Sequence, residues 1–235
     1  TAPYTLVDSI RVGPTMSDIT RGWFNNFQQL ARQPELTWFR SRDPGAAGAW
    51  CNSTTERRDY AFELYRMRVE FHTPIAARTF VTEPSDALAM PQYWGTQVPQ
   101  NLKLSLFIQG TDELLSLPAV SIPGGVGESF PYSDNAGAGL NSPGSNGAPS
   151  MMGYIFPKPV EVPTNAQFYV TGVLEPLVKQ FFLNYPTTPG NIVVPGPLPP
   201  PGEPPTVVST PAIYSVRIYM DGKRFLQLRG ARSAP

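Results

Sequence analysis

Proline and glycine recur along the whole of this 235-residue chain and limit how much of it can be helical. The chain holds 28 prolines and 20 glycines, about a fifth of its residues, against an average of roughly 12%. Proline removes a backbone donor and glycine adds conformational entropy to the unfolded chain, so both disfavour long uninterrupted helices. We therefore expect a fold of short strands joined by extended connections.

Two segments alternate apolar and polar residues in the way that is typical of strands. In residues 102–108, Leu102, Leu104 and Leu106 fall on one phase. In residues 60–71 the apolar phase changes near Leu64, which predicts a bulge that keeps one face inward. Further strands are expected at 79–82, 152–156 and 167–174.

Only one segment is a good helix candidate. Ser17 and Asp18 can cap a helix that runs to about Arg32, where Pro34 follows. Several apolar residues in this segment fall near helical spacing on one face: Trp23, Phe24, Phe27 and Leu30.

The C-terminal end has the turn chemistry of a β-hairpin. Asp221 and Gly222 follow an alternating apolar run. A three-residue loop over 220–222 would pair Val216 with Leu226 and keep both on one face, so we expect that register.

The segments assemble into one predicted domain with a leading arm. Residues 1–15 show no firm period and are expected to form an extended N-terminal arm. Residues 16–235 are expected to form an all-β, antiparallel sandwich with one short helix. Long insertions are expected at 124–150, which is rich in glycine, and at 195–205, a stiff polyproline connection that separates two strands.

The residues that usually carry catalysis or bind metals are scarce. His72 is the sole histidine and Cys51 the sole cysteine, which argues against a zinc site, and the chain has no Gly-x-Ser-x-Gly motif. Carboxylate clusters exist but lack a diagnostic neighbourhood: Asp112 with Glu113, Glu83 with Asp86, and Glu63 with Glu70. We therefore expect no enzyme, no cofactor and no metal. No run of 18 apolar residues predicts a membrane-spanning helix.

The chain carries few charges for its size. Charged residues make up 15% of it, against a usual value of about 25%, and its formal net charge is zero. A chain with so few charges would have an unusually apolar surface, and we expect much of that surface to lie against other subunits. The candidate interface residues are Trp23, Phe24, Phe27, Trp38 and Trp94. Basic residues gather near the C-terminus, and Arg224, Arg229 and Arg232 are candidate contacts for a partner.

The extended arm, the long Pro/Gly-rich loops and the low charge resemble the jelly-roll capsid proteins of icosahedral viruses and bacteriophages. Residues 156–170, Phe-Pro-Lys-Pro-Val-Glu-Val-Pro-Thr-Asn-Ala-Gln-Phe-Tyr-Val, are similar to strand-turn-strand stretches in phage structural proteins. The resemblance implies a single jelly roll that assembles with copies of itself, and with other structural proteins, into the shell of a virion. The basic C-terminal end would be a candidate contact for nucleic acid or an internal membrane. Direct packaging through residues 1–15 is doubtful, because Arg11 is their only basic residue.

Two other functions compete with this prediction. A carbohydrate- or receptor-binding sandwich, such as a spike, fibre or extracellular module, would display tryptophans in a groove on which sugars stack. A hydrolase would use one of the carboxylate pairs as acid and base. The positions of the tryptophans and the oligomeric state distinguish these functions from the shell protein.

Overall fold

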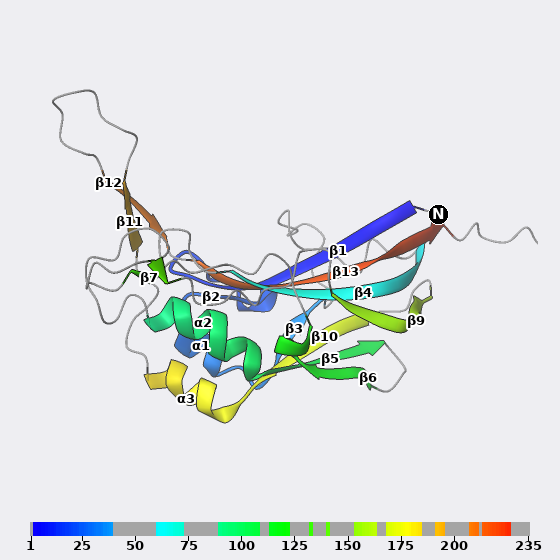
Figure 1. Cartoon of the computed structure of the whole chain (residues 1–235), viewed down its shortest axis with the longest axis horizontal. Helices are drawn as coiled ribbons and strands as arrows, with labels where there is room; N and C mark the ends of the chain where they lie inside the picture. The colour runs from blue at the N-terminus through cyan, green and yellow to red at the C-terminus, as the bar shows by residue number, and fades with distance from the viewer. Residues whose placement is uncertain are drawn as a thin grey trace, which may run out of the picture.

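The structure is a computed structural model that describes residues 2–39, 60–72, 89–108, 113–122, 132–133, 140–141, 153–163, 168–184, 191–195, 207–211 and 213–226. The described chain is mostly β, and two large sheets lie one above the other as layers (Figure 1). The predicted all-β sandwich is confirmed in this broad form.

The larger sheet has five strands in the order β2-β1-β13-β4-β9. Every neighbouring pair is antiparallel except β1 with β2. The strands are β1 (Ala2–Val12), β2 (Trp23–Phe24), β4 (Tyr60–His72), β9 (Tyr154–Val162) and β13 (Tyr214–Leu226). β9 contains Pro157 and Pro159, which its position at the edge of the sheet tolerates because an edge strand needs fewer ladder donors.

The second sheet has four strands in the order β3-β10-β5-β6, all antiparallel. They are β3 (Leu36–Trp38), β5 (Leu102–Ile108), β6 (Glu113–Pro118) and β10 (Phe168–Leu174). Two short antiparallel pairs complete the strands: β7 (Tyr132–Ser133) with β8 (Leu140–Asn141), and β11 (Asn191–Pro195) with β12 (Val207–Pro211). The β11–β12 ribbon projects away from the sandwich (Figure 1).

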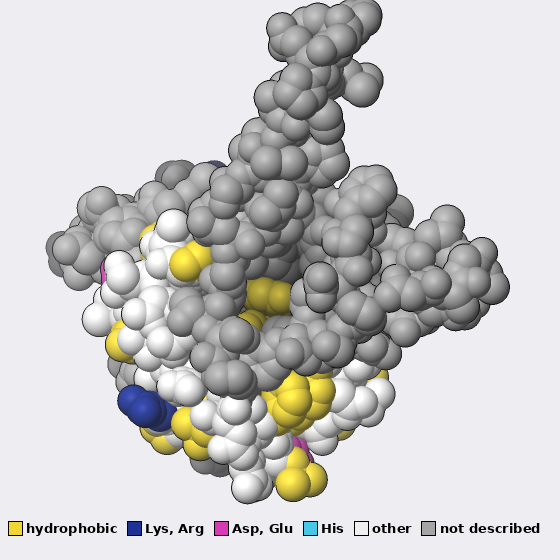
Figure 2. All heavy atoms as spheres, turned by 90° about the vertical axis from the view of Figure 1, so that its left-hand side faces the viewer, with side chains coloured by type: hydrophobic (Ala, Val, Ile, Leu, Met, Phe, Trp, Pro, Cys, Tyr) yellow, Lys and Arg dark blue, Asp and Glu magenta, His cyan; other side chains and the backbone are white. Residues whose placement is uncertain are grey.

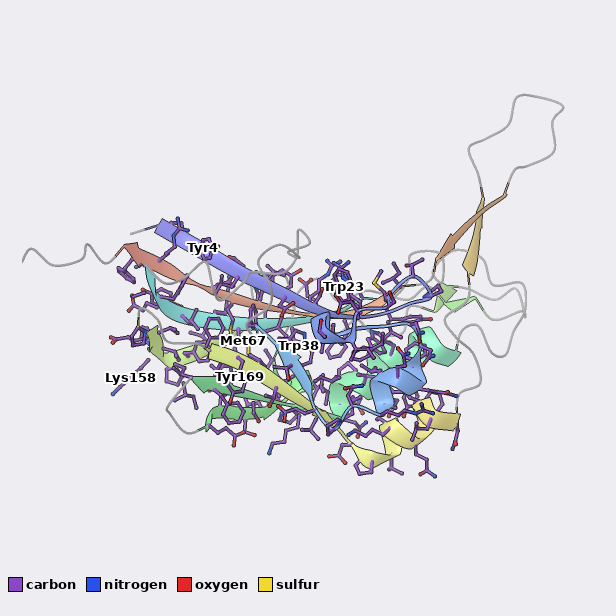
Figure 3. All side chains as sticks on the ribbon, turned by 180° about the vertical axis from the view of Figure 1, so that it is seen from behind. Tyr4, Trp23, Trp38, Met67, Lys158 and Tyr169 are labelled. Atoms are coloured by element: carbon purple, nitrogen blue, oxygen red, sulfur yellow. The ribbon has the colours of Figure 1, made fainter. Side chains whose placement is uncertain are left out.

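The core lies between the two large sheets, where the predicted period-two strands turn their apolar residues inward. Met67 of β4 and Trp38 of β3 are fully buried there (Figure 3). The indole Nε1 of Trp38 donates to the carbonyl of Val216 in the opposite sheet at 3.2 Å, so this side chain ties the layers together. The strand predicted at 60–71 and its bulge are confirmed, because the register shifts between Leu64 and Arg66.

Three helices gather at one end of the sandwich: α1 (Phe27–Ala31), α2 (Ala89–Gln100) and α3 (Pro176–Asn184) (Figure 1). Buried aromatic rings join them. Phe27 stacks on Phe182 at 5.1 Å between ring centroids, and Trp94 meets Tyr214 of β13 edge-on at 5.6 Å. The helices therefore close this end of the core.

The helix predicted from Ser17 to Arg32 is confirmed only at its end, because α1 spans Phe27–Ala31 with Arg32 as its C-cap. The predicted start is wrong, and α2 and α3 were not expected. A 3₁₀ turn, η1 (Ile19–Arg21), ends at Gly22, whose φ of 71° is left-handed, and β2 follows. α1 starts only after Asn26, whose side chain accepts a hydrogen bond from the Gln29 backbone at 2.8 Å and caps the helix. A second 3₁₀ turn, η5 (Ala119–Ser121), follows β6.

The segment predicted as an arm, residues 1–15, contains strand β1, which pairs with β13 from Ala2 to Val12. Its inward phase runs through Leu6, Asp8, Ile10 and Val12, all buried. The polar Asp8 hides the period in the sequence. The described part of the segment is therefore an integral strand of the sandwich and not a free arm.

The predicted C-terminal hairpin is also wrong. β13 runs without a turn from Tyr214 to Leu226, and Val216 pairs with Ile10 and Phe71 instead of Leu226. Gly222 lies opposite the bulge of β4, and an added Cβ would collide with the Glu63 carbonyl oxygen. A close backbone approach, and not a turn, explains this glycine.

The predicted insertions are described only in part. Residues 124–150 include the short strands β7 and β8. β11 ends at Pro195 and β12 begins at Val207, so nearly all of the predicted polyproline connection lies outside the described residues. The strand expected at 79–82 lies outside the described residues.

Candidate functional site

The outer face of the five-stranded sheet carries a network of charged side chains. The register places four rows on this face: Thr5, Asp221 and Arg66; Val7, Tyr219 and Arg68; Ser9, Arg217 and Glu70; Arg11, Ser215 and His72. Arginines outnumber carboxylates in these rows, so the face has a positive balance. We call these rows the ionic face.

Asp221 is the hub of the first two rows. Its carboxylate accepts hydrogen bonds from Arg66 Nε at 2.8 Å, from Arg68 Nε at 2.9 Å and from Thr5 Oγ1 at 2.8 Å. Burial alone would raise the pKa of Asp221. The hydrogen bonds from Arg68, Thr5 and Arg66, together with the charge of Arg68, outweigh burial and hold the pKa below its usual value. The residue read from the sequence as part of a turn is therefore an ion-pair centre.

The sole histidine belongs to the same face. His72 Nε2 lies 2.9 Å from Glu70 Oε2, which also accepts a hydrogen bond from the Tyr219 hydroxyl at 2.6 Å. Burial would raise the pKa of Glu70, but the bonds from His72 and Tyr219 outweigh it and lower the pKa. Burial and the bond to Glu70 raise the pKa of Tyr219. The carboxylate of Glu70 and the imidazole of His72 are thus paired with each other within the sheet.

The outer face of the four-stranded sheet is different, because it is nearly free of charge. Its residues form three rows: Val173, Lys103 and Pro118; Thr37, Thr171, Ser105 and Ser116; Tyr169, Phe107 and Glu113. Phe107 and Tyr169 stack at 5.2 Å between centroids, and the Ser105 and Ser116 hydroxyls lie 3.2 Å apart. We call these rows the neutral face.

The charges of the neutral face stand at its two opposite edges. Lys103 is in the first row and Glu113 in the third, and both are exposed. Hydrogen bonds from Ser105 and Ser116, together with the charge of Lys103, lower the pKa of Glu113, so it is ionised at neutral pH. The face therefore carries one fixed charge of each sign with hydroxyl and aromatic groups between them.

The helical end also exposes apolar side chains. Leu177 and Leu183 of α3 are 76% and 42% exposed, and Phe181 stacks on Tyr93 at 3.8 Å in a half-buried pair. Figure 2 shows that the described side chains at this end are mostly hydrophobic or uncharged, with few charged groups.

The predicted interface residues lie mostly inside the chain. Phe24, Phe27, Trp38 and Trp94 are at most 2% exposed, so they form the core and cannot contact a partner. Trp23 is half-buried on β2, with the Arg11 guanidinium 5.3 Å from its ring centroid. The three described tryptophans therefore do not form the open stacking groove that the carbohydrate-binding alternative requires, and Trp50 lies outside the described residues.

Of the predicted basic contacts, only Arg224 is described. Its guanidinium lies 4.9 Å from the centroid of the Tyr4 ring at the end of the sandwich away from the helices. Arg229 and Arg232 lie outside the described residues. The role predicted for this end in binding a partner stays a prediction.

Of the predicted carboxylate pairs, only Glu63 with Glu70 is described in full, and these two are too far apart for an acid and a base. Glu63 and Glu70 stand seven positions apart along β4, roughly 20 Å at about 3.3 Å per residue, well beyond the ~5–9.5 Å that glycosidases use. Asp112, Glu83 and Asp86 lie outside the described residues. Within the described ranges, no three His, Cys, Asp or Glu side chains cluster as metal ligands, and no helix is long and apolar enough to cross a membrane.

No protein-family model, curated protein or solved structure matches the chain.

Proposed function

We propose that this chain is a jelly-roll structural protein that assembles with copies of itself into a closed shell, like the coat proteins of icosahedral viruses and bacteriophages. Its place would be the virion, and its partners would be other copies and companion structural proteins.

The strand order is the observation that carries the proposal. Apart from the two-residue β2, the two large sheets contain eight strands, in chain order β1, β3, β4, β5, β6, β9, β10 and β13. The first pairs with the last, the second with the seventh, the third with the sixth and the fourth with the fifth. Two further pairs, β13 with β4 and β10 with β5, join these into the two sheets.

This pattern is expected when the chain first forms one long antiparallel hairpin, in which the first strand pairs with the last. The hairpin then wraps around itself and gives the two sheets of a sandwich. A jelly roll has eight strands in two sheets, so this pairing supports the proposed fold. The fold hosts more than one function, so the surface must supply the rest of the argument.

Two surface features support assembly. The neutral face is poor in charge for a solvent-facing sheet, and α3 exposes two leucines. The β11–β12 ribbon has two strands, and an isolated two-stranded hairpin is marginally stable in water. Contact with a neighbouring subunit would stabilise it, as arms do in closed assemblies.

The oligomeric state of the purified chain tests the proposal. We expect light scattering to report large oligomers of defined mass and electron microscopy to show closed particles. A chain that stays monomeric as its concentration is raised, in both low and moderate salt, would refute a shell-forming role.

A further inference from the structure

The neutral face has a symmetry that suggests its partner. Its middle row holds the hydroxyl side chains Thr37, Thr171, Ser105 and Ser116, and the two outer rows lie about 7 Å away on either side, two residues along each strand. One outer row carries a cation beside an aliphatic side chain. The other carries an anion beside two aromatic rings.

We infer that the neutral face binds the neutral face of a second copy around a two-fold axis that lies between the two sheets and runs along the middle row, across the strands. This inference rests on the proposed self-assembly and names one of its contacts. A two-fold contact uses the same patch on both partners, so the patch must complement itself.

Rotation about this axis exchanges the outer rows. Lys103 of one copy then lies over Phe107 of the other. Glu113 of that second copy is on the neighbouring strand, about 4.8 Å from Phe107. The ammonium group gains both a ring face and a carboxylate, and each interface contains this contact twice. A two-fold axis along the strands would instead keep the rows and exchange the strands, so Lys103 would lie over Val173 of the other copy and away from Glu113.

The remaining groups of the face fit the same placement. The exposed Val173 of one copy lies over the Tyr169 ring of the other, apolar against aromatic. In the middle row, Ser105 and Ser116 of one copy lie over the same residues of the other, and a hydroxyl can both donate and accept, whereas Thr171 is buried below them. No like charges approach each other in this arrangement.

The size of the face indicates how strong the contact is. The four strands β3, β10, β5 and β6 have three, seven, seven and six residues, and at about 4.8 Å by about 3.3 Å per residue they cover roughly 360 Å² per copy, or roughly 700 Å² in total. Stable isolated dimers usually bury at least about 1,200 Å². The contact is therefore weak in one pair and suited to a shell, where many copies repeat it.

Charge reversal on this face tests the inference. Lys103→Glu places two glutamates together in each contact, and Glu113→Lys places two lysines together. Both side chains are exposed, so either variant should keep the fold. We expect each variant alone to assemble at least about tenfold less readily than the unmodified chain, measured as the concentration at which light scattering rises.

Mixing the two variants gives the decisive measurement. In an equimolar mixture, the carboxylate introduced at position 103 of one chain faces the ammonium group introduced at position 113 of the other. The second contact of that interface keeps the original Lys103 and Glu113, so both contacts join opposite charges. Assembly should therefore return toward the unmodified level, and an attraction within one chain cannot produce this recovery. The matched control pair is Lys158→Glu and Glu161→Lys on β9, exposed residues of the other sheet, which should leave assembly unchanged.

The outcomes separate this inference from the proposed function. If the unmodified chain assembles and the two reversals do not weaken it, the neutral face meets a different partner or solvent, and the inference is wrong while the shell proposal stands. If both reversals weaken assembly but the mixture does not recover, the two-fold pairing is wrong. If the unmodified chain never assembles, the proposed function itself fails.

Discussion

Asp8 offers the sharpest test of how the two sheets are held together. Its side chain is 1% exposed and projects from β1 into the sandwich. Oδ2 accepts the backbone N–H of Phe39 at 2.7 Å, just after β3 of the other sheet, and Oδ1 accepts the N–H of Ser9 at 2.7 Å. Phe39 has a left-handed φ of 61°, a conformation that a bulky residue adopts only when its surroundings hold it there.

Replacing Asp8 by alanine removes both acceptors from a site that water does not reach. A hydrogen bond to a charged group contributes about 1.5–3 kcal/mol, and leaving a buried donor without a partner costs about 1–3 kcal/mol. We expect Asp8→Ala to lower the free energy of unfolding by about 3–4 kcal/mol, a large part of the roughly 5–15 kcal/mol typical of a domain. Asp8→Asn keeps one carbonyl oxygen as an acceptor and should lose about half as much.

Urea unfolding followed by tryptophan fluorescence measures this loss, because Trp38 lies next to Phe39 in the core. Protein concentration must be matched between variants, since self-association adds to apparent stability. Asp18→Ala is the control, because that carboxylate bonds Thr20 near the surface. If Asp8→Ala loses no more stability than Asp18→Ala, the link between the sheets does not depend on this carboxylate.

Two further substitutions test the ionic face and the bulge. The folded-state pKa values of Asp221 and Glu70 are lowered, so their stabilisation is present above the unfolded pKa and is lost as pH falls through the folded pKa. Between about pH 5 and about pH 3, the urea midpoint of the unmodified chain should therefore fall more steeply than that of Asp221→Asn, and equal slopes would show that the arginine pairs add no stability. Gly222→Ala should destabilise by about 1–3 kcal/mol or more, because its Cβ would meet the Glu63 carbonyl, whereas Lys223→Ala beside it should change the urea midpoint little. A neutral Gly222→Ala would mean that the bulge of β4 can move.

The sequence predicted strands where side-chain alternation was undisturbed. β5 shows it because Leu102, Leu104 and Leu106 face the core while Lys103 and Ser105 face out. In β4 the bulge could also be predicted, because the alternation of apolar and polar residues shifts by one position near Leu64. β1 has the same period, but the buried Asp8 occupies an inward position, and its partner Phe39 is 31 residues away. A buried polar residue whose partner in the other sheet is so distant in sequence cannot be recognised as inward-facing from local pattern.

Helix α2 and the C-terminal strand were missed for related reasons. α2 has Pro91 in its first turn, where proline is tolerated, but Pro99 lies inside the helix near its C-terminal end, where it has no N–H for the helical hydrogen bond. Both prolines argue locally against the helix that the structure contains. Asp221 and Gly222 have ideal turn chemistry, yet the aspartate is there for Arg66 and Arg68 and the glycine for the bulge. Local propensity favoured the turn, and long-range contacts override it.

The neutral face shows where sequence reasoning about function ends. Low charge over the whole chain indicates that some surface is covered, but it does not say which one. The outward residues of β5 read Lys103, Ser105, Phe107, and those of β10 read Tyr169, Thr171, Val173. Only the antiparallel register brings Phe107 beside Tyr169 and puts the hydroxyls in one row between opposite charges. Self-complementarity is a property of the paired sheet and of no single segment, so the composition led us to expect a contact, and the strand pairing is the basis on which we propose where it lies.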